Sequence, residues 1–585
     1  MSQVIQHLVM PNLVFGAPEE MYVRLGHGRE HVLMSEGRLL FDAGGSASFD
    51  SYFNSITVGA WKRHTEIRDL QLRLRGQGRF VVRLGLHRIG HAQRWLSEQL
   101  ATLALDEDLV VDVAAWAKLE SGMLYFAVEA LEAGALTAGG FSTRTVQKRE
   151  VKLGIVITHF NRKAYVLPAI QRIRDELLRD PLYKGRIELI VVDNSQNIMM
   201  EEAAGITLIP NKNFGGSGGF ARGLLHLKDQ QDFTHCLFMD DDASCEIESI
   251  KRAFHLIQFS MTDNVSVSGS LLRELEPYRL HEKGGQFDDG HWKPIKHGGD
   301  MRCVNSLLFA EASDHLPNYG AWWFFAFPIA QVKAFPFPFF VRGDDAQFSL
   351  QNDFQIVTMN GVGCWGDDFG YKESPLTRYL GARATLLLLI NFSNVSRWRY
   401  FKTMLSWCVA SLFSYNYASA RACCMAIQHV LQGPGFFVEN IDASGVRQAI
   451  GAACPDEKLT LLQKHDFSLV YADRKESWPR FIFRWMTLNG FLLPSVFLKN
   501  RVVYQEKTFR GIFREVFRFK KIFYQYEPTG MGYIAEFDRG RFFLGFFQFA
   551  LLSCTFLLRL PSLRRVYRSA WSQMTSEDFW RNIYR

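Results

Sequence analysis

Apolar runs alternate with an amphipathic segment between residues 151 and 243, and this alternation restricts the fold more than any other feature. Buried strands are indicated by VKLGIVITHF (151–160), IELIVVDNS (187–195) and HCLFMDDDA (235–243), and a helix by AYVLPAIQRIRDELLRD (164–180). Alternating strands and helices favour a parallel sheet with ligand chemistry at the carboxyl ends of its strands. We therefore predict a Rossmann-like α/β domain over residues 149–395.

The flanking regions have different patterns, so we predict a multi-domain α/β protein. Residues 1–148 contain short alternating runs separated by Gly-rich turns, such as RFVVRLGLH (79–87), which predict a β-sandwich of the jelly-roll type. Residues 396–585 are rich in Phe, Trp, Arg and Lys and predict a helical, basic region that associates with a membrane.

Composition excludes several classes of protein. With 22% charged residues and no low-complexity tract, a chain of 585 residues is not predominantly disordered. Its nine cysteines include no C-x-x-C pair, which argues against a zinc site or a disulfide framework and favours a reducing cytoplasm. The first 20 residues lack the basic and apolar regions of a signal peptide. We expect a cytoplasmic protein.

The positive charge is concentrated near the C-terminus. Residues 501–585 hold 15 Lys and Arg against 7 Asp and Glu, whereas the whole chain carries a net charge of +7. Within them, 542–558 is an apolar run of 17 residues, shorter than the ~20 of a spanning helix. These features predict a helix lying on an anionic membrane surface, with a buried core helix or a homo-oligomer contact as alternatives. No nucleic-acid-binding motif is present.

Three consecutive carboxylates, Asp240, Asp241 and Asp242, end the strand at HCLFM. Clustered carboxylates repel one another unless a cation or hydrogen bonds offset the repulsion, and their hard oxygens suit Mg²⁺ or Mn²⁺. We predict that Asp240 and Asp242 hold a divalent metal ion, with an acidic turn capping the next helix as the alternative.

A glycine-rich turn, NKNFGGSGGFARG (211–223), precedes a predicted helix. Its glycines permit close backbone approach, and a helix N-terminus offers N–H groups to an anion. Polar residues also follow the first two strands, in THFNR (158–162) and VVDN (191–194). These segments predict a ligand bearing a diphosphate, with ordinary strand-end turns as the alternative.

Together, THFNR, VVDN, NFGGSGGF and MDDDA resemble the nucleotide-binding half of GT-A glycosyltransferases of the inverting family 2. The segments NYGAWWFFAFP (318–328) and FVRGDDAQFSL (340–350) are similar to the acceptor and base segments of polymerising bacterial galactofuranosyltransferases, and 50–65 is similar to their β-sandwich. The resemblance covers most of residues 30–400. It implies a GT-A catalytic domain that uses a UDP-sugar donor, a divalent metal, and a lipid-linked or oligosaccharide acceptor.

Roles for individual residues follow from the same resemblance. Asp345 would be the general base, because inverting transfer needs one carboxylate to take the proton of the acceptor hydroxyl. Trp322 and Trp323 would stack on the acceptor sugar beside Asp344. The residues expected around the nucleotide sugar are Thr158, Asn161, Arg162, Asp193, Asn194, Asn213, Gly215, Gly216, Ser217, Gly218, Gly219 and Asp241. From the residues alone, Asp344 or Asp345 can equally be a helix cap, and the Trp pair can equally belong to a core.

The chain also departs from the family pattern. The histidine that usually completes the metal shell is absent after Trp365, where Gly366, Asp367 and Asp368 follow; either aspartate is a candidate third ligand. Gly343 and Ala384 replace a Trp and an Asn of the family.

We predict transfer of galactofuranose from UDP-galactofuranose to a growing cell-surface polysaccharide, at the cytoplasmic face of the membrane. The alternatives are a GT-A transferase for another nucleotide sugar (rhamnose, galactopyranose or glucose) and a non-catalytic carbohydrate-binding subunit.

Overall fold

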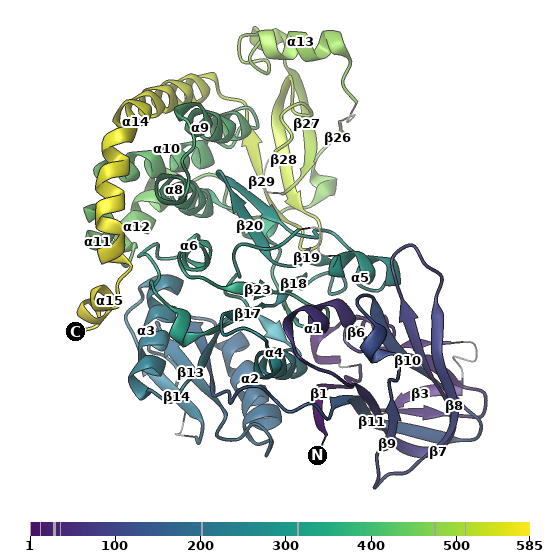
Figure 1. Ribbon diagram of the computed structural model, residues 1–585. Coiled ribbons are helices and arrows are strands. Elements are labelled where there is room, and N and C mark those ends of the chain that lie inside the picture. The colour runs from purple at the N-terminus through teal and green to yellow at the C-terminus, as the bar shows by residue number, and fades with distance from the viewer. Residues whose placement is uncertain are drawn as a thin grey trace.

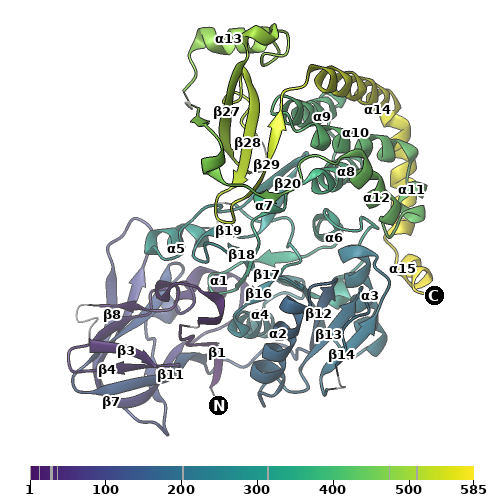
Figure 2. The ribbon, with the colours of Figure 1, turned by 180° about the vertical axis from the view of Figure 1, so that it is seen from behind.

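The computed structural model describes residues 2–585 apart from 12, 27–30, 36, 201–202, 313–314, 473–474 and 509–510. Figures 1 and 2 show the β-rich N-terminal part beside the central α/β part, with a helical layer and a separate small sheet on the other side of the central part.

The N-terminal part is built around one long strand, β7 (Gln71–His87). Its first half pairs with β11 and its second half with β10, so β7 takes part in both layers of the module. Gly78, at φ +104°, lies where the strand passes from one partner to the other. Alternate residues such as Leu72, Leu84 and Phe126 fill the space between the layers. The other strands with their bounds are β1 (Gln3–His7), β2 (Arg24–Leu25), β3 (Val32–Ser35), β4 (Arg38–Phe41), β5 (Ser46–Ser48), β6 (Ile56–Thr57), β8 (Arg94–Leu103), β9 (Leu109–Asp112), β10 (Met123–Ala130) and β11 (Gly134–Thr143), with helix α1 (Val58–His64).

The central part contains a seven-stranded sheet in the order β14-β13-β12-β15-β22-β17-β23. The first four of these strands are parallel neighbours, as the alternating pattern predicts, and β22 runs antiparallel beside β15. Helix α3 packs against β12 and β13. The bounds are β12 (Leu153–His159), β13 (Ile187–Asp193), β14 (Ile206–Pro210), β15 (His235–Asp240), β17 (Val265–Ser268), β22 (Phe325–Pro328), β23 (Gln355–Val357), α2 (Lys163–Ile173), α3 (Gly215–Gln230) and α4 (Ile247–Phe259).

A smaller sheet, in the order β16-β24-β18-β19, adjoins the end of β15. Strand β16 directly follows the three aspartates and pairs with β24, which brings the segment after Trp365 to their side. The bounds here are β16 (Ser244–Cys245), β18 (Ser270–Arg273), β19 (Leu280–Glu282), β24 (Gly363–Gly366), the hairpin β20 (Gly285–Asp288) and β21 (His291–Pro294), α5 (Val304–Glu311), α6 (Asp344–Gln351) and α7 (Phe369–Lys372).

The C-terminal part is not wholly helical, which corrects the prediction for residues 396–585. Between its helices lies a five-stranded sheet in the order β25-β29-β28-β27-β26, which carries α13 at its tip (Figure 1). The segment KKIFYQY (520–526) lies in β28, where most side chains are buried. Its aromatic and β-branched residues suit a strand, whereas the basic residues around it led us to expect an amphipathic helix. The strands are β25 (Thr460–Leu461), β26 (Leu469–Tyr471), β27 (Lys499–Glu506), β28 (Phe519–Tyr526) and β29 (Met531–Glu536).

Helices α8, α9, α10 and α14 pack together as a layer, and Figure 2 shows α6 beneath it. The long α14 runs down the outside of the layer, and both views place the following helix, α15, beside α3. The helices of this part are α8 (Pro375–Phe392), α9 (Arg397–Leu412), α10 (Tyr417–Gln432), α11 (Gly435–Glu439), α12 (Ser444–Ala453), α13 (Trp478–Met486), α14 (Arg539–Met574) and α15 (Glu577–Ile583).

In the described part of the chain, α14 is the one helix whose length and apolar composition would let it cross a bilayer. It contains residues 542–558, and its two faces differ. Phe542, Phe549 and Phe556 are buried in the helical layer, whereas Leu544 and Phe547 are more than two-thirds exposed. The apolar run therefore contributes to the core on one side and leaves a second apolar side uncovered.

Candidate active site

The three aspartates lie at the carboxyl end of β15 and meet side chains from the end of β12. Arg162 Nη1 lies 2.6 Å from Asp242 Oδ2 and 3.2 Å from Asp241 Oδ1. Asp241 also accepts hydrogen bonds from the Phe160 backbone N–H and lies 3.2 Å from His159 Nδ1. The parallel arrangement of β12 and β15 thus joins THFNR to the acidic cluster, as predicted from their places at strand ends.

The acidic cluster has the chemistry of a cation site. Burial, and then the carboxylates of Asp242 and Asp241, raise the pKa of Asp240 to about 8, because a further negative charge at this place is poorly compensated. A divalent cation with oxygen ligands would relieve this charge. Among the described residues, however, no three His, Cys, Asp or Glu side chains stand close enough together to hold an ion. Asp240 and Asp242 therefore remain candidate ligands by the chemistry of their oxygens, and in the described part of the chain no third side chain completes a shell with them as they stand.

The two candidates for the third ligand are placed differently. Asp368 caps α7, where its Oδ1 accepts a hydrogen bond from Gly370 N at 2.7 Å, and its Oδ2 pairs with Arg273 at 3.2 Å. That carboxylate is already engaged, which argues against Asp368 as a ligand. Asp367 Oδ2 instead lies 3.4 Å from Lys372 Nζ, and the same nitrogen lies 2.8 Å from Asp242 Oδ2. Of the two, Asp367 is the one near the cluster.

The glycine-rich turn forms the start of α3 and meets the segment before α6. Gly215 has φ +69°, and a Cβ there would lie 2.1 Å from the carbonyl oxygen of Phe340. Ser217 N donates a hydrogen bond to that oxygen at 3.1 Å. A Cβ at Gly219 would lie 2.1 Å from Thr158 Cγ2, and the Thr158 hydroxyl is buried without a hydrogen-bond partner. These glycines are therefore needed for close packing of the turn against the end of β12 and against the segment before α6.

The residues predicted around the nucleotide do not all face open space. Each Asp193 carboxylate oxygen accepts two hydrogen bonds from residues 195–198, between 2.8 and 3.0 Å, so Asp193 holds the shape of its own loop. Asn194 bonds to the Gly215 carbonyl and to Asn211. Asn161 is exposed with φ +55°. Beside the turn lies an opening of about 400 Å³. The residues that line it include Asn194, Ser195, Lys212, Asn213, Asp442 and Arg447.

The predicted base, Asp345, lines a cavity of about 520 Å³ beneath the helical layer. Burial holds the pKa of Asp345 above its usual range, against backbone hydrogen bonds and the Arg342 charge, which act in the opposite direction. Its neighbour Asp344 does not line this cavity but accepts a hydrogen bond from Ser217 Oγ at 2.8 Å. The predicted contact of Asp344 with the acceptor is thus replaced by a contact with the glycine-rich turn.

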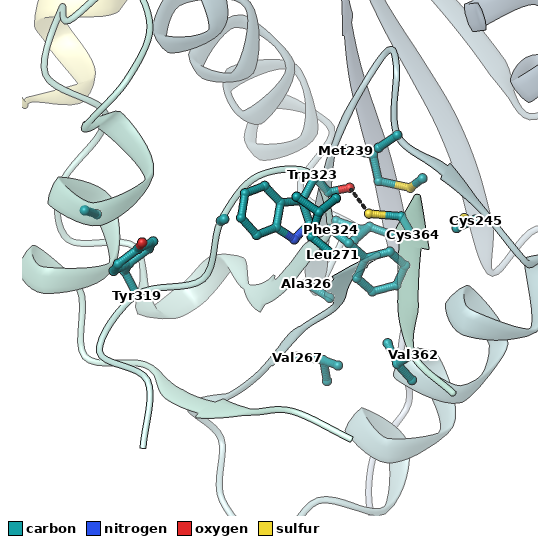
Figure 3. Close-up of a cluster of buried hydrophobic side chains, with 14 of the residues drawn as sticks. Met239, Cys245, Val267, Leu271, Tyr319, Trp323, Phe324, Ala326, Val362 and Cys364 are labelled. Atoms are coloured by element: carbon teal, nitrogen blue, oxygen red, sulfur yellow. Dashed lines mark hydrogen bonds between the residues drawn. The ribbon is translucent and has the colours of Figure 1, made fainter. Parts of the chain in front are cut away.

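Of the two predicted acceptor tryptophans, only Trp323 lines the cavity. Its indole N–H donates to Gly269 O at 3.0 Å, and its backbone carbonyl accepts a hydrogen bond from the Cys364 thiol, as Figure 3 shows. Trp322 points into the opposite core, where it packs edge-on against Phe220, Phe238 and Phe348. The predicted stacking role of Trp322 does not fit this placement, because its ring is part of an aromatic core and does not line the cavity.

The sequence analysis missed Glu282, which lines the same cavity. Burial, and then the Asp345 charge, raise the pKa of Glu282 to about 8, and its Oε1 has no hydrogen-bond partner. A protonated carboxyl group here can donate a hydrogen bond to a ligand hydroxyl. Its position at the end of the short strand β19 carries no signal in the sequence, because its neighbours come from distant segments.

Comparison with known proteins defines the class of this site. Residues 154–296, within the central part, match the model of Glycosyl transferase family 2, which supports a glycosyltransferase. The galactofuranosyltransferase GlfT2 of Mycobacterium tuberculosis is 24% identical over 369 residues, covering 58% of this chain and 57% of the relative. That of Mycolicibacterium smegmatis is 23% identical over 362 residues, covering 56% and 55%. These matches confirm the predicted resemblance, and the alignment spans little more than half of each relative.

Among solved structures, a mannosyltransferase from Pyrobaculum calidifontis in complex with GDP-Man and Mn²⁺ is 12% identical, with a TM-score of 0.28, covering 53% of this chain and 87% of that one.

Proposed function

We propose that this chain is an inverting glycosyltransferase that transfers galactofuranose from UDP-galactofuranose to a growing cell-surface polysaccharide. The observation that carries the proposal is the position of Asp345 in a cavity next to the glycine-rich turn, with the acidic cluster on the neighbouring strand end. The galactofuranosyl donor is supported by the similarity to the two mycobacterial relatives.

In this proposal each group has a defined task. Asp345 takes the proton of the acceptor hydroxyl, which then attacks the anomeric carbon as the bond to the diphosphate breaks. Protonated Glu282 and Trp323 orient the acceptor in the cavity. Arg162 and the backbone of Gly215–Gly219 hold the diphosphate. Asp240 and Asp242 would hold Mn²⁺ or Mg²⁺, which would neutralise the leaving diphosphate when bound.

We further propose a division of the chain into a β-sandwich (1–148), a GT-A catalytic domain (149–395) and a membrane-associating region (396–585) at the cytoplasmic face. The exposed apolar side of α14 supports the last assignment, since apolar side chains flanked by arginines suit an anionic lipid interface. A lipid-linked acceptor would then be presented at the same surface.

A donor panel tests the proposed function. Purified protein is incubated with a short galactoside acceptor, a divalent metal or EDTA, and one of UDP-galactofuranose, UDP-galactopyranose, UDP-glucose or dTDP-rhamnose. We expect metal-dependent transfer from UDP-galactofuranose alone. Transfer only from another donor would contradict the sugar assignment, and no transfer from any donor would favour a non-catalytic carbohydrate-binding subunit.

A further inference from the structure

The side chain of Lys372 joins two acidic segments that lie far apart in the sequence. Its Nζ donates a hydrogen bond to Asp242 Oδ2 at 2.8 Å and lies 3.4 Å from Asp367 Oδ2. Lys372 is the last residue of the four-residue helix α7, which begins directly after the cap at Asp368. A single ammonium group therefore bridges the two carboxylates that a bound ion would share.

The position of this ammonium coincides with the gap in the predicted metal shell. The segment after Trp365 supplies the third ligand in the family that this chain resembles, and here it supplies Asp367 together with a lysine. A protonated lysine has no free lone pair and cannot be a metal ligand. Lys372 and a metal ion therefore compete for the same carboxylates. As the side chains stand, the cation position is taken by the protein itself.

Lys372 has the freedom to leave this position. Its side chain is 30% exposed, and a lysine joins its charge to the backbone through a flexible four-carbon stem. Arg162, at 2.6 Å from the same Asp242 oxygen, would remain to balance the charge of the cluster. A diphosphate arriving beside Arg162 would offer the released ammonium a new anionic partner.

We propose that Lys372 is an exchangeable counter-cation: it closes the site between Asp242 and Asp367 in the free protein, and it moves to the diphosphate of the nucleotide when a divalent ion takes its place. The identity of the nucleotide ligand rests on the function proposed above. The exchange makes metal binding weak without nucleotide and strong with it, because each ligand favours the same displaced position of the lysine.

The test is calorimetric titration of Mn²⁺ into the full chain without nucleotide, followed by titration of UDP in excess Mn²⁺. Removing the competing charge in Lys372→Met should tighten Mn²⁺ binding by about tenfold and weaken UDP binding by about tenfold. Lys372→Arg keeps the charge and should stay within about threefold of the wild type in both titrations. Lys372→Gln is a second neutral variant, and circular dichroism checks that each variant is folded.

Lys251→Met is the matched control, because Lys251 forms a comparable ion pair with Asp180 at 3.2 Å outside the site. It should leave both titrations unchanged. Unchanged or weaker Mn²⁺ binding in both neutral variants would overturn the exchange, and unchanged UDP binding would overturn the contact with the diphosphate. Neither titration depends on sugar transfer, so a failed donor panel alongside the expected Mn²⁺ result would count only against the proposed function.

Discussion

Ser217 donates its hydroxyl hydrogen bond to the carboxylate of Asp344 at 2.8 Å and so connects the start of α3 with the start of α6. The two residues belong to the predicted donor and acceptor segments, 127 positions apart. Asp344 is occupied in this contact, and of the two adjacent aspartates it is Asp345 that lines the cavity. One hydrogen bond therefore aligns the donor turn with the proposed base.

The first prediction separates the two adjacent aspartates. Asp345→Asn removes the base and should lower kcat by about 10²-fold or more while leaving the Kd for UDP unchanged. Asp344→Asn keeps the base and alters the contact with Ser217, so its main effect should be a higher KM for the donor. Steady-state kinetics and calorimetry measure both. Equal losses of kcat in the two variants would contradict the assignment.

The second prediction concerns pH. The pKa of Asp345 is raised by burial, and a base acts only when deprotonated, so the rate should fall on acidification at a pH above the ~4 of a free carboxyl group. The Arg342 charge lowers this pKa, so Arg342→Gln should move the acidic limb of kcat to higher pH. An acidic limb of kcat at the same pH in Arg342→Gln and in the wild type would contradict the effect of the Arg342 charge on Asp345.

The third prediction concerns the effect of Glu282 on the pH dependence of the rate. With a pKa of about 8, its carboxyl group is neutral at lower pH and loses its proton as the pH rises through that value. The neutral Glu282→Gln variant should therefore retain most of its activity at pH 7 and lose the change in rate that the wild type shows near pH 8. Retention of that change would assign it to another group.

Some parts of this site could be predicted from the sequence, and others could not. The acidic cluster and the glycine-rich turn were predictable, because a buried apolar strand that ends in polar residues delivers them to the edge of a parallel sheet. The different placement of Trp322 and Trp323 was not predictable, because it depends on which side of an irregular segment faces the core. Glu282 and Lys372 acquire their surroundings only through tertiary packing.

The C-terminal region shows the same limit for secondary structure. The helical expectation holds for α14, where a long apolar run has no strand-like alternation. It fails for 520–526, where short aromatic runs with interspersed lysines fit either structure and pairing with β27 and β29 decides the outcome.

The fourth prediction tests contacts of the last helix with the donor turn. The hydroxyl of Tyr584 donates a hydrogen bond to the carbonyl of Gly218, and the buried indole of Trp580 donates to Pro336 O at 2.7 Å. Tyr584→Phe should raise the Kd for UDP about threefold to tenfold through a looser turn. Hydrogen exchange of residues 214–223 should increase as well. Asn582→Ala, on the exposed side of α15, should change neither quantity.

The fifth prediction concerns the uncovered side of α14. Replacing Leu544 and Phe547 together by Ser should weaken binding to vesicles containing anionic lipid by about tenfold or more, because two large apolar side chains lose their lipid contact. Flotation of the full chain with vesicles measures this binding. Leu100→Ser, at a residue that is 76% exposed on the β-sandwich, is the control. Equal flotation of both variants would favour a subunit contact.

The docking of α15 on α3 has a consequence for biosynthesis. Side chains of α15 and of the segment just after it contact the donor turn and the far end of α3, so a nascent chain cannot complete this support until residues 577–584 have left the ribosome. Activity would thus arise only after residues 577–584 have docked, and a chain cut short before α15 would leave the back of its donor turn unsupported.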